Sequence, residues 1–557
     1  EYMLSENFKN DLGENWKIKE NEYPTIDNTK IGIQINYIED LIELSNNINT
    51  SINQHCKLYR VPIYINKTLD FEEDESYKNS EDISYGDLNG NGVVEAVKEE
   101  LTNKEGKGFT PINKTIGVSF SPIIYGKNNE IRNLYMNNSD GDNLAFIGRM
   151  QSGQIKDLTV SGNIVATRKY TTMAGIIGNS GDFNSINDFY PDLIIENCHS
   201  KVNISNSVEV QYVGGISGIS GAREIKQCSN SGNISATKCD YEGGIIGIRA
   251  DDWGSYIENV IYSCYNSGNI ISKDSAYSNS TGGIAGHSGI DIVNCKNYGK
   301  ITIENAKKAD IGGIAGSIKY GTTIYGCVNT GEIIGEDFNG DELIGGIVGR
   351  LPSTVQLINN ENSGDLTIKS IKNDSYISIS GICALYYYDT LIYNCKNKGN
   401  IKLNDEVSNE KSTVYVSGII GVTQGSTSYK NVKKLYNEGN ITVENCSSTV
   451  YASGGISGSS IQTSDFINKG NITIKSKERI IVTGISNSSY YSGEKLINYG
   501  NINAISENGD VTVCGVIYQG ANENYKRIEN YGDIYAKGKN IEINGIGAGY
   551  GYFETCD

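Results

Sequence analysis

Residues 294–303 read NCKNYGKITI, and residues 326–335, which begin 32 positions later, read GCVNTGEIIG. Both stretches place Cys, Asn, Gly and Ile at every second position. Side chains at positions i, i+2 and i+4 of a β-strand point to the same face. Cys295, Asn297 and Ile301 therefore share one face. Because the opposite face of the first stretch carries lysines, the Cys, Asn, Gly and Ile face is predicted to be buried.

Copies of this motif run through most of the chain. Successive copies are 30 to 40 residues apart when a degenerate copy, NCHSKVNIS, with Val202 in the glycine position is included. The glycines of the motif are Gly162, Gly232, Gly268, Gly299, Gly331, Gly364, Gly399, Gly439, Gly470, Gly500 and Gly532. A chain of 557 residues would usually divide into several domains. A repeat array does not, because each unit contacts only its neighbours.

A second motif, with the pattern GGIxG, lies between copies of the first. Examples are VGGISG at residues 213–218, TGGIAG at 281–286 and IGGIVG at 344–349, and a decayed copy, VTGIS, lies at 482–486. Two β-like segments therefore recur in each unit of about 30 residues, and no helical periodicity competes with them. The pattern predicts an all-β repeat fold.

If each unit forms one coil, the inner residues of neighbouring units stack in columns about 4.8 Å apart. A buried Asn in each coil can pass amide hydrogen bonds along the stack, and an inward Gly leaves room where the chain turns. The predicted structural columns contain Cys228, Cys264, Cys295, Cys327 and Cys395, together with Asn230, Asn266, Asn297, Asn329 and Asn397. The sequence leaves open whether a unit forms one coil or two.

The 12 cysteines admit three interpretations, which are core packing, disulfide bonds and a metal site. The Cys position of the motif holds Asn360, Leu435 or Phe466 in other units, so it is mainly an apolar position in which a free Cys acts as a small hydrophobe. No CxxC pair occurs among them. Buried packing is favoured, and disulfides between neighbouring coils or metal binding stay as alternatives.

Composition limits the partners. A net charge of −18 argues against binding to a phosphate backbone, so no nucleic-acid partner is expected. No window of about 18 consecutive apolar residues occurs, so no membrane insertion is expected. The chain begins without Met or a signal-peptide pattern and stops within a repeat at FETCD. We therefore expect a monomeric module of a larger chain.

The N-terminal part differs from the array. The segment YIEDLIELSNN, which begins at Tyr37, has apolar residues at helical spacing, and KLYRVPIYINKTLDF at residues 57–71 has the pattern of a strand. A helix laid across the first coil would cover its exposed edge. We expect residues 29–150 to form an N-terminal cap and first irregular coils, and residues 151–557 to form the repeats.

One segment of this N-terminal part resembles the start of a calcium-binding loop. Asp87, Asn89 and Asn91, followed by Glu95, have the spacing of the first ligands. The twelfth position, however, is Lys98, where a bidentate Glu belongs. A polar turn before a helix explains the segment equally well. Calcium is thus one interpretation of this segment, and no other cofactor is expected.

Together these features resemble the GLUG-motif repeat proteins, whose name describes the segment written here as GGIAG and GGIVG. The segments LSNNIN, KTLDF, GKGFTPI, IIYGKNNEIRNLYM and LAFIGRM are also similar to that family, so the resemblance covers about residues 30–557. Such repeats occur in surface adhesin-like proteins and beside the catalytic domains of IgA1-specific zinc metallopeptidases of Gram-positive bacteria. The resemblance implies a right-handed parallel β-helix outside a bacterial cell. Residues 1–28 then look like the tail of a preceding module or a linker.

Catalysis by this segment is not expected. Zinc peptidases of this kind need an HExxH motif, but the histidines His55, His199 and His287 are isolated. This excludes zinc proteolysis here, although a catalytic domain elsewhere in a longer protein stays open. Many parallel β-helices act on acidic polysaccharides with carboxylates gathered on one face. The outward residues of this motif vary between units, and no carboxylate pair repeats.

Aromatic residues near interrupted repeats are the candidate binding residues, because exposed rings stack on sugars or anchor protein partners. They are Tyr386, Tyr387, Tyr388, Tyr490, Tyr491 and Trp253. Alternatively, these rings cover one edge of the β-helix.

The sequence therefore predicts a secreted or cell-surface module that acts as a rigid spacer or as an adhesin, displaying loops to a host protein or glycan. Two alternatives remain. One is the non-catalytic, substrate-presenting region of a secreted IgA-type metallopeptidase, and the other is a polysaccharide-active β-helix enzyme.

Overall fold

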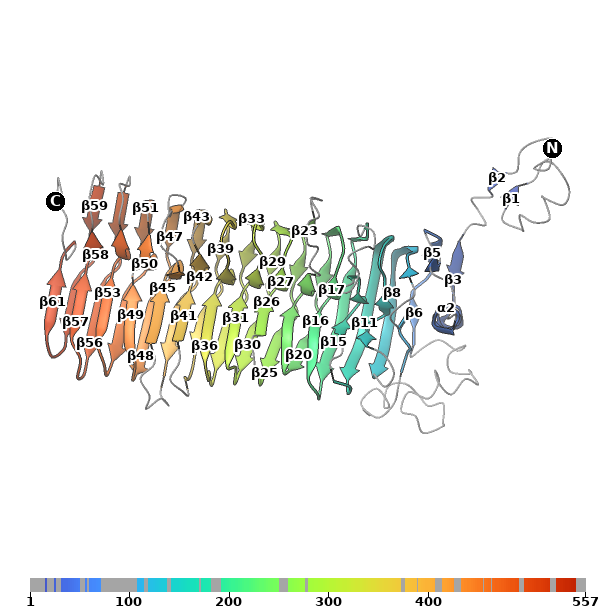
Figure 1. Cartoon of the computed structure of the whole chain (residues 1–557), viewed down its shortest axis with the longest axis horizontal. Coiled ribbons are helices and arrows are strands. Elements are labelled where there is room, and N and C mark those ends of the chain that lie inside the picture. Colours follow the sequence, from blue (N-terminus) through green and yellow to red (C-terminus); the bar gives the residue numbers. More distant parts are fainter. Residues whose placement is uncertain are drawn as a thin grey trace.

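The computed structural model describes residues 32–50, 60–71, 108–114, 119–137, 142–169, 172–181, 192–249, 259–275, 279–371, 376–387, 389–405, 413–424, 432–453, 455–461, 463–489, 495–520 and 527–546, with short pieces at 16–17, 25–26 and 56–57. These residues form an all-β parallel solenoid (Figure 1). The predicted fold class is confirmed. One of its sheets contains 12 strands, one from each coil, so the solenoid has about 12 coils.

One coil illustrates the path of the chain. It contains β18 (Glu224–Lys226), β19 (Ser229–Asn230), β20 (Ile234–Thr237), β21 (Cys239–Gly243) and β22 (Ile246–Arg249). The first three strands belong to a long sheet that holds three short segments from most coils. β21 belongs to a 13-stranded sheet and β22 to a 12-stranded sheet. The GGI turn separates these last two sheets.

The same pattern repeats in the neighbouring coils. In the long sheet the next strands are β23 (Val260–Tyr262), β24 (Tyr265–Asn266), β25 (Ile270–Lys273), β28 (Asp291–Val293), β29 (Lys296–Asn297), β30 (Ile301–Glu304), β33 (Thr323–Tyr325), β34 (Val328–Asn329), β35 (Ile333–Glu336), β38 (Gln356–Ile358), β39 (Glu361–Asn362), β40 (Leu366–Ile368), β43 (Leu391–Asn397) and β44 (Ile401–Asn404). In the 13-stranded sheet they are β26 (Asn279–Gly282), β31 (Lys308–Gly312), β36 (Asp341–Gly345), β41 (Tyr376–Ser380), β45 (Thr413–Ser417) and β49 (Thr449–Ser453). In the 12-stranded sheet they are β27 (Ala285–Ser288), β32 (Ala315–Ile318), β37 (Val348–Leu351), β42 (Cys383–Tyr387) and β46 (Ile420–Gln424).

Each repeat makes one coil, which settles the alternative that the sequence left open. Ile234 pairs with Ile270, Ile270 with Ile301, and Ile301 with Ile333, all in parallel register. Each of these residues is the isoleucine of one copy of the NxGxI motif. Variation in repeat length is therefore absorbed between the strands, and the strands stay aligned.

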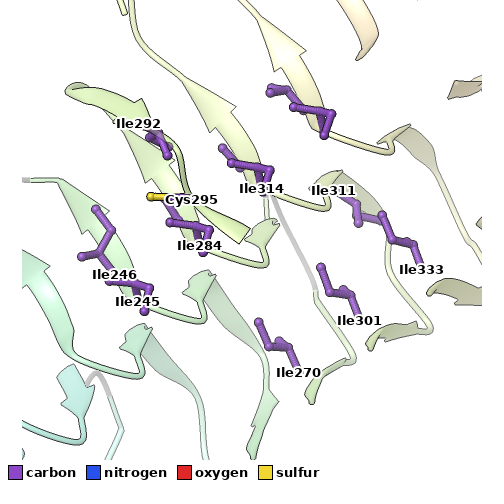
Figure 2. Packing of buried hydrophobic residues seen from close by; sticks show 14 of the residues in the cluster. Ile245, Ile246, Ile270, Ile284, Ile292, Cys295, Ile301, Ile311, Ile314 and Ile333 are labelled. Carbon is purple, nitrogen blue, oxygen red and sulfur yellow. The ribbon is translucent and has the colours of Figure 1, made fainter. Parts of the chain in front are cut away.

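The interior is filled mainly by isoleucine. Ile270, Ile301 and Ile333 from the long sheet face Ile284 and Ile314, which follow the glycines of the GGI turns (Figure 2). One continuous hydrophobic cluster runs from Ile35 to Ile528. Burial of apolar surface along the entire stack is the main stabilising term.

A hydrogen-bonded asparagine ladder runs through this core. Asn266 donates from Nδ2 to Oδ1 of Asn297 at 2.9 Å and to the carbonyl oxygen of Gly268 at 2.9 Å. Nine such side-chain bonds join the ladder asparagines in sequence order, which are Asn230, Asn266, Asn297, Asn329, Asn362, Asn397, Asn437, Asn468, Asn498 and Asn530. The predicted ladder is therefore present, and each amide also braces the turn two residues later.

The GGI glycines leave space for this ladder. A Cβ atom on Gly283 would lie 2.3 Å from Cγ of Asn297 and 2.2 Å from the carbonyl oxygen of Gly313 in the next coil. Gly244 and Gly313 face Asn266 and Asn329 in the same way. The two sequence motifs therefore recur together because they pack against each other.

The cysteine column packs beside the asparagines. Cys228, Cys264, Cys295, Cys327 and Cys395 are buried free thiols, as are the other described cysteines outside the 56–57 piece. Burial raises the pKa of Cys264, and it raises the pKa of Cys395 to about 12. In the coil between the last two, Asn360 takes the cysteine position and accepts a hydrogen bond from the backbone N–H of Cys327 at 2.9 Å. Packing thus accounts for the column.

The residue before each cysteine position bends the long sheet. It has a left-handed conformation, with φ between 50° and 64°, in ten coils. The residues are Asp157, Asn197, Gln227, Ser263, Asn294, Gly326, Asn359, Asn394, Lys434 and Asp465. Asn, Asp and Gly tolerate this conformation best, which explains their frequency here.

At the N-terminal end, the predicted helix is present as α2 (Ile38–Thr50), beside β3 (Ile33–Ile35) and β5 (Pro62–Ile65) (Figure 1). Ser45 Oγ donates to the carbonyl oxygen of Thr110 at 2.8 Å, and the apolar residues of the helix join the main core. The predicted strand at residues 57–71 is divided into Cys56–Lys57, β5 and Leu69–Asp70. In the described part of the chain, no helical segment is long and apolar enough to cross a membrane.

Candidate functional site

The predicted binding tyrosines have different positions from those expected. Tyr386 on β42 belongs to the main hydrophobic core, as Cys383 does, and is 1% exposed. It cannot stack on a ligand, so the prediction is wrong for this residue. Tyr387 is half-buried on the outer face. Tyr388, Tyr490, Tyr491 and Trp253 lie outside the described residues, as do the calcium candidates Asp87, Asn89, Asn91 and Glu95.

Polar and titratable side chains that could serve catalysis or binding gather where the 13-stranded and 12-stranded sheets meet on the outer surface. We call this line of contact the seam, and we define it by Tyr241, Ser280, His287, Asp310, Ser317 and Arg350. The last glycine of each GGIxG motif makes the seam narrow. A Cβ on Gly316 would lie 2.6 Å from backbone atoms of both Asp310 and Thr281. The two sheets therefore touch through their backbones, and longer side chains meet just outside this contact.

One part of the seam contains a histidine and two serines. His287 on β27 lies edge-on to the ring of Tyr241 on β21, with ring centroids 5.9 Å apart. Its Nδ1 is 2.9 Å from Oγ of Ser317 on β32, and that Oγ is 2.9 Å from Oγ of Ser280 on β26. The contacts of His287 could not be read from the sequence, because Ser317 and Tyr241 are 30 or more positions away from it.

The next part of the seam contains an ion pair. Arg350 on β37 donates from Nε and Nη2 to the two carboxylate oxygens of Asp310 on β31, at 2.7 Å and 3.0 Å. Burial raises the pKa of Asp310 even though Arg350 opposes that shift. Burial alone would lower the pKa of Arg350, but its hydrogen bonds to Asp310 and Tyr387 raise it. Tyr387 is therefore the predicted binding residue that belongs to a polar cluster.

The chemistry of the seam is that of a junction between sheets. Asp310 is held in a two-point contact with a cation, so it is a poor general base. Ser317 is 7% exposed and is hydrogen-bonded to both His287 and Ser280, so its hydroxyl is not presented to a substrate. A nucleophilic serine needs access and a base that is oriented by a third group. The contacts of Ser317 with His287 and Ser280 instead stabilise the seam.

A second surface feature lies on the outer face of the long sheet. Tyr262, Val293, Tyr325, Ile358 and Tyr393 occupy matched positions on five successive coils. We call these five residues the tyrosine column, and strands β23, β33 and β43, which carry its tyrosines, lie near the top of Figure 1. Tyr262 and Tyr325 are 42% and 41% exposed, which is high for aromatic side chains in a folded sheet.

The surroundings of the tyrosine column add further rings. Tyr265 and Tyr298 are exposed beside it and contact each other edge to face at 6.3 Å. Lys434 Nζ lies 5.2 Å from the centre of the Tyr393 ring and partly covers it. The sequence signal for the column is the recurring IYxC string at residues 261–264, 324–327 and 392–395, which contains the outward tyrosine two positions before the cysteine.

Two glutamates lie inside the core. Glu242 on β21 accepts a hydrogen bond from Ser272 Oγ at 2.8 Å, and burial raises its pKa to about 8. Burial also raises the pKa of Glu342 on β36 well above the ordinary value. Both side chains are enclosed, so they affect stability and cannot reach a ligand.

Among the described residues, no three His, Cys, Asp or Glu side chains are grouped so that they could hold a metal ion.

No protein-family model matches the chain, and no curated protein matches it. The resemblance to GLUG-motif proteins therefore rests on the sequence motifs alone.

One solved structure to which the chain is similar is that of a "putative immunoglobulin A1 protease" from Bacteroides ovatus. The sequence identity is 15% and the TM-score is 0.35, over 70% of this chain and 83% of that chain. Values this low say nothing about activity, so function has to be argued from the side chains.

Proposed function

We propose that this chain is a rigid, non-catalytic module of the bacterial cell surface, which holds an attached domain or its own side faces away from the cell. The observation that carries the proposal is the asparagine ladder. Its hydrogen bonds are continuous from Asn230 to Asn530 and are accompanied by an unbroken apolar core. A stack without an internal break has no hinge, so its two ends stay at a fixed distance and orientation.

The surface chemistry supports a role in display. The seam uses its ionic and hydroxyl groups to join two sheets, and the tyrosine column places aromatic rings in solvent. Exposed aromatic rings on a rigid scaffold are typical of binding surfaces. A module that both spaces and binds is an adhesin. The alternative, a non-catalytic region beside a secreted peptidase domain, rests on the sequence resemblance, and the full-length gene separates the two by the presence or absence of HExxH.

Antibodies against the purified chain test the location. Applied to intact producing cells, they are expected to label the surface, and labelling only after lysis would contradict the proposal.

The role as a spacer is tested by comparing the unmodified chain with a chain that is shorter by one coil. Asn297 and Asn329 occupy the same position in adjacent coils, so deleting residues 298–329 removes one complete coil. The shortened chain is expected to stay folded and to lose about 4.8 Å of length by small-angle scattering. Collapse or an unchanged length would contradict a stacked rod.

A further inference from the structure

The tyrosine column has a regular spacing along the solenoid axis. Tyr262, Tyr325 and Tyr393 are separated by two coils each, with Val293 and Ile358 on the coils between them. Coils are about 4.8 Å apart, so the tyrosines recur about every 10 Å along a straight line. An apolar side chain separates each pair of rings.

The column has defined ends. Lys226 takes its position on the preceding coil and Lys433 on the following coil. Between these lysines the five positions carry no charge, although the chain as a whole has a net charge of −18. The uncharged strip is four coil steps long, or about 19 Å. An anionic polymer is disfavoured by the net charge, so the surface fits a neutral, extended ligand.

An extended β-1,4-linked glycan matches this geometry. Each sugar advances the chain by nearly the height of one coil. Successive rings are turned over, so the same ring face recurs at every second sugar. Pyranose faces carry C–H groups that pack on aromatic rings. The tyrosines would then contact every second sugar, and Val293 and Ile358 would contact the edges of the sugars between them.

We propose that the tyrosine column binds a neutral β-1,4-linked glycan of five or more sugars, which lies parallel to the solenoid axis, with Tyr265 and Tyr298 at its side. This inference rests on the proposed display function and names its ligand class. Tyr393 contributes less than the other two tyrosines because Lys434 partly covers its ring.

Calorimetric titration of the full chain with cello- and chito-oligosaccharides of two to six sugars tests the proposal. Affinity is expected to rise up to five sugars, one for each position of the column, and then to level off. The double variant Tyr262→Ala, Tyr325→Ala is expected to bind at least about tenfold more weakly than the unmodified chain. The single variant Tyr393→Ala is expected to lose less affinity.

The control is the double exchange Tyr499→Ala and Tyr531→Ala. These two rings are also exposed on the long sheet and stack at 5.0 Å, but they lie outside the column. Binding should be unchanged in this control. Absence of binding by the unmodified chain, an equal loss in both double variants, or no loss in the Tyr262 and Tyr325 variant would overturn the inference.

Other occupants of the column have their own signatures. A concentration-dependent dimer that the Tyr262 and Tyr325 exchanges abolish would assign the column to self-association and overturn glycan binding. Binding of a matrix protein instead of any glycan would do the same. A chain that scatters as a rod but binds no glycan would contradict this inference alone, whereas a chain that is not a rod would contradict the proposed function.

Discussion

Asn297 donates a hydrogen bond from Nδ2 to Oδ1 of Asn329 at 2.9 Å, although the two residues are 32 positions apart and both are fully buried. The same amide nitrogen also donates to the carbonyl oxygen of Gly299 at 2.9 Å. A buried polar group is stable only when its partners are present. Each ladder amide therefore fixes the register of the next coil as well as the turn in its own.

Exchanging Asn329→Ala should lower the free energy of unfolding by about 2–4 kcal/mol, because it leaves groups on Asn297 and Asn362 without their partners. Urea denaturation followed by circular dichroism measures the change. The matched control is Asn501→Ala, since Asn501 is exposed and its Oδ1 accepts from the backbone N–H of Asp533. It should cost less than about 1 kcal/mol. Equal costs would contradict a structural role specific to the buried ladder.

The ladder begins at Asn230, whose Oδ1 has no hydrogen-bond partner among the described residues. The preceding coil has Ser200 in the matching position, and Ser200 faces Gly175. Exchanging Ser200→Asn should extend the ladder by one residue and stabilise the fold by about 1 kcal/mol. A rise in melting temperature is the expected result, and a fall would indicate that this coil has no room for the longer side chain.

Gly283→Ala should destabilise the fold by about 3 kcal/mol or more, because its Cβ would overlap Asn297 and the backbone of Gly313. Gly289→Ala is the matched control. The nearest atom to a Cβ there is Cδ of the flexible Lys319 side chain, at 3.4 Å. The control should melt within a few degrees of the unmodified chain. Similar melting temperatures for the two variants would refute the close contact between glycine and the ladder.

Glu242 makes stability depend on pH. Its pKa is raised by burial from 4.5 to about 8, so the folded state binds a proton that the unfolded state has released over this interval. Stability should therefore fall as the pH rises from about 4.5 to about 8. Glu242→Gln keeps a hydrogen-bonding side chain without the charge, so it should flatten this dependence and increase stability at pH 8. Denaturation midpoints at several pH values measure the difference, and an unchanged slope would contradict the assignment to Glu242.

Much of the fold is predictable because its determinants are local and repeated. The alternation around Cys295 and Asn297 fixes which face is buried, and the recurrence of both motifs fixes the stacking. The surface features are harder to predict. The contact of His287 with Ser317 depends on an offset between two sheets that the repeat spacing does not encode.

The tyrosines show the same limit. Tyr386 lies in a run of three tyrosines, LYYYDT, and joins the main core, whereas Tyr387 packs against a separate cluster that contains Leu343. Strict alternation does not predict this, because Cys383 and Tyr386 both face the core although they are three positions apart. The exposed column around Tyr262 could have been found from the IYxC string. Such a prediction has to take into account that the residue before the cysteine is left-handed, because this residue shifts the inward and outward positions by one.

The stacking of one repeat per coil is tested most directly by the distance between Ser231 and Lys469, each exchanged for cysteine and spin-labelled. Both residues are exposed and follow ladder asparagines separated by seven coil steps. Pulsed electron–electron double resonance should give one narrow distance near 34 Å, for coils about 4.8 Å apart. A value near 67 Å, or a broad distribution typical of hinged units, would contradict the account.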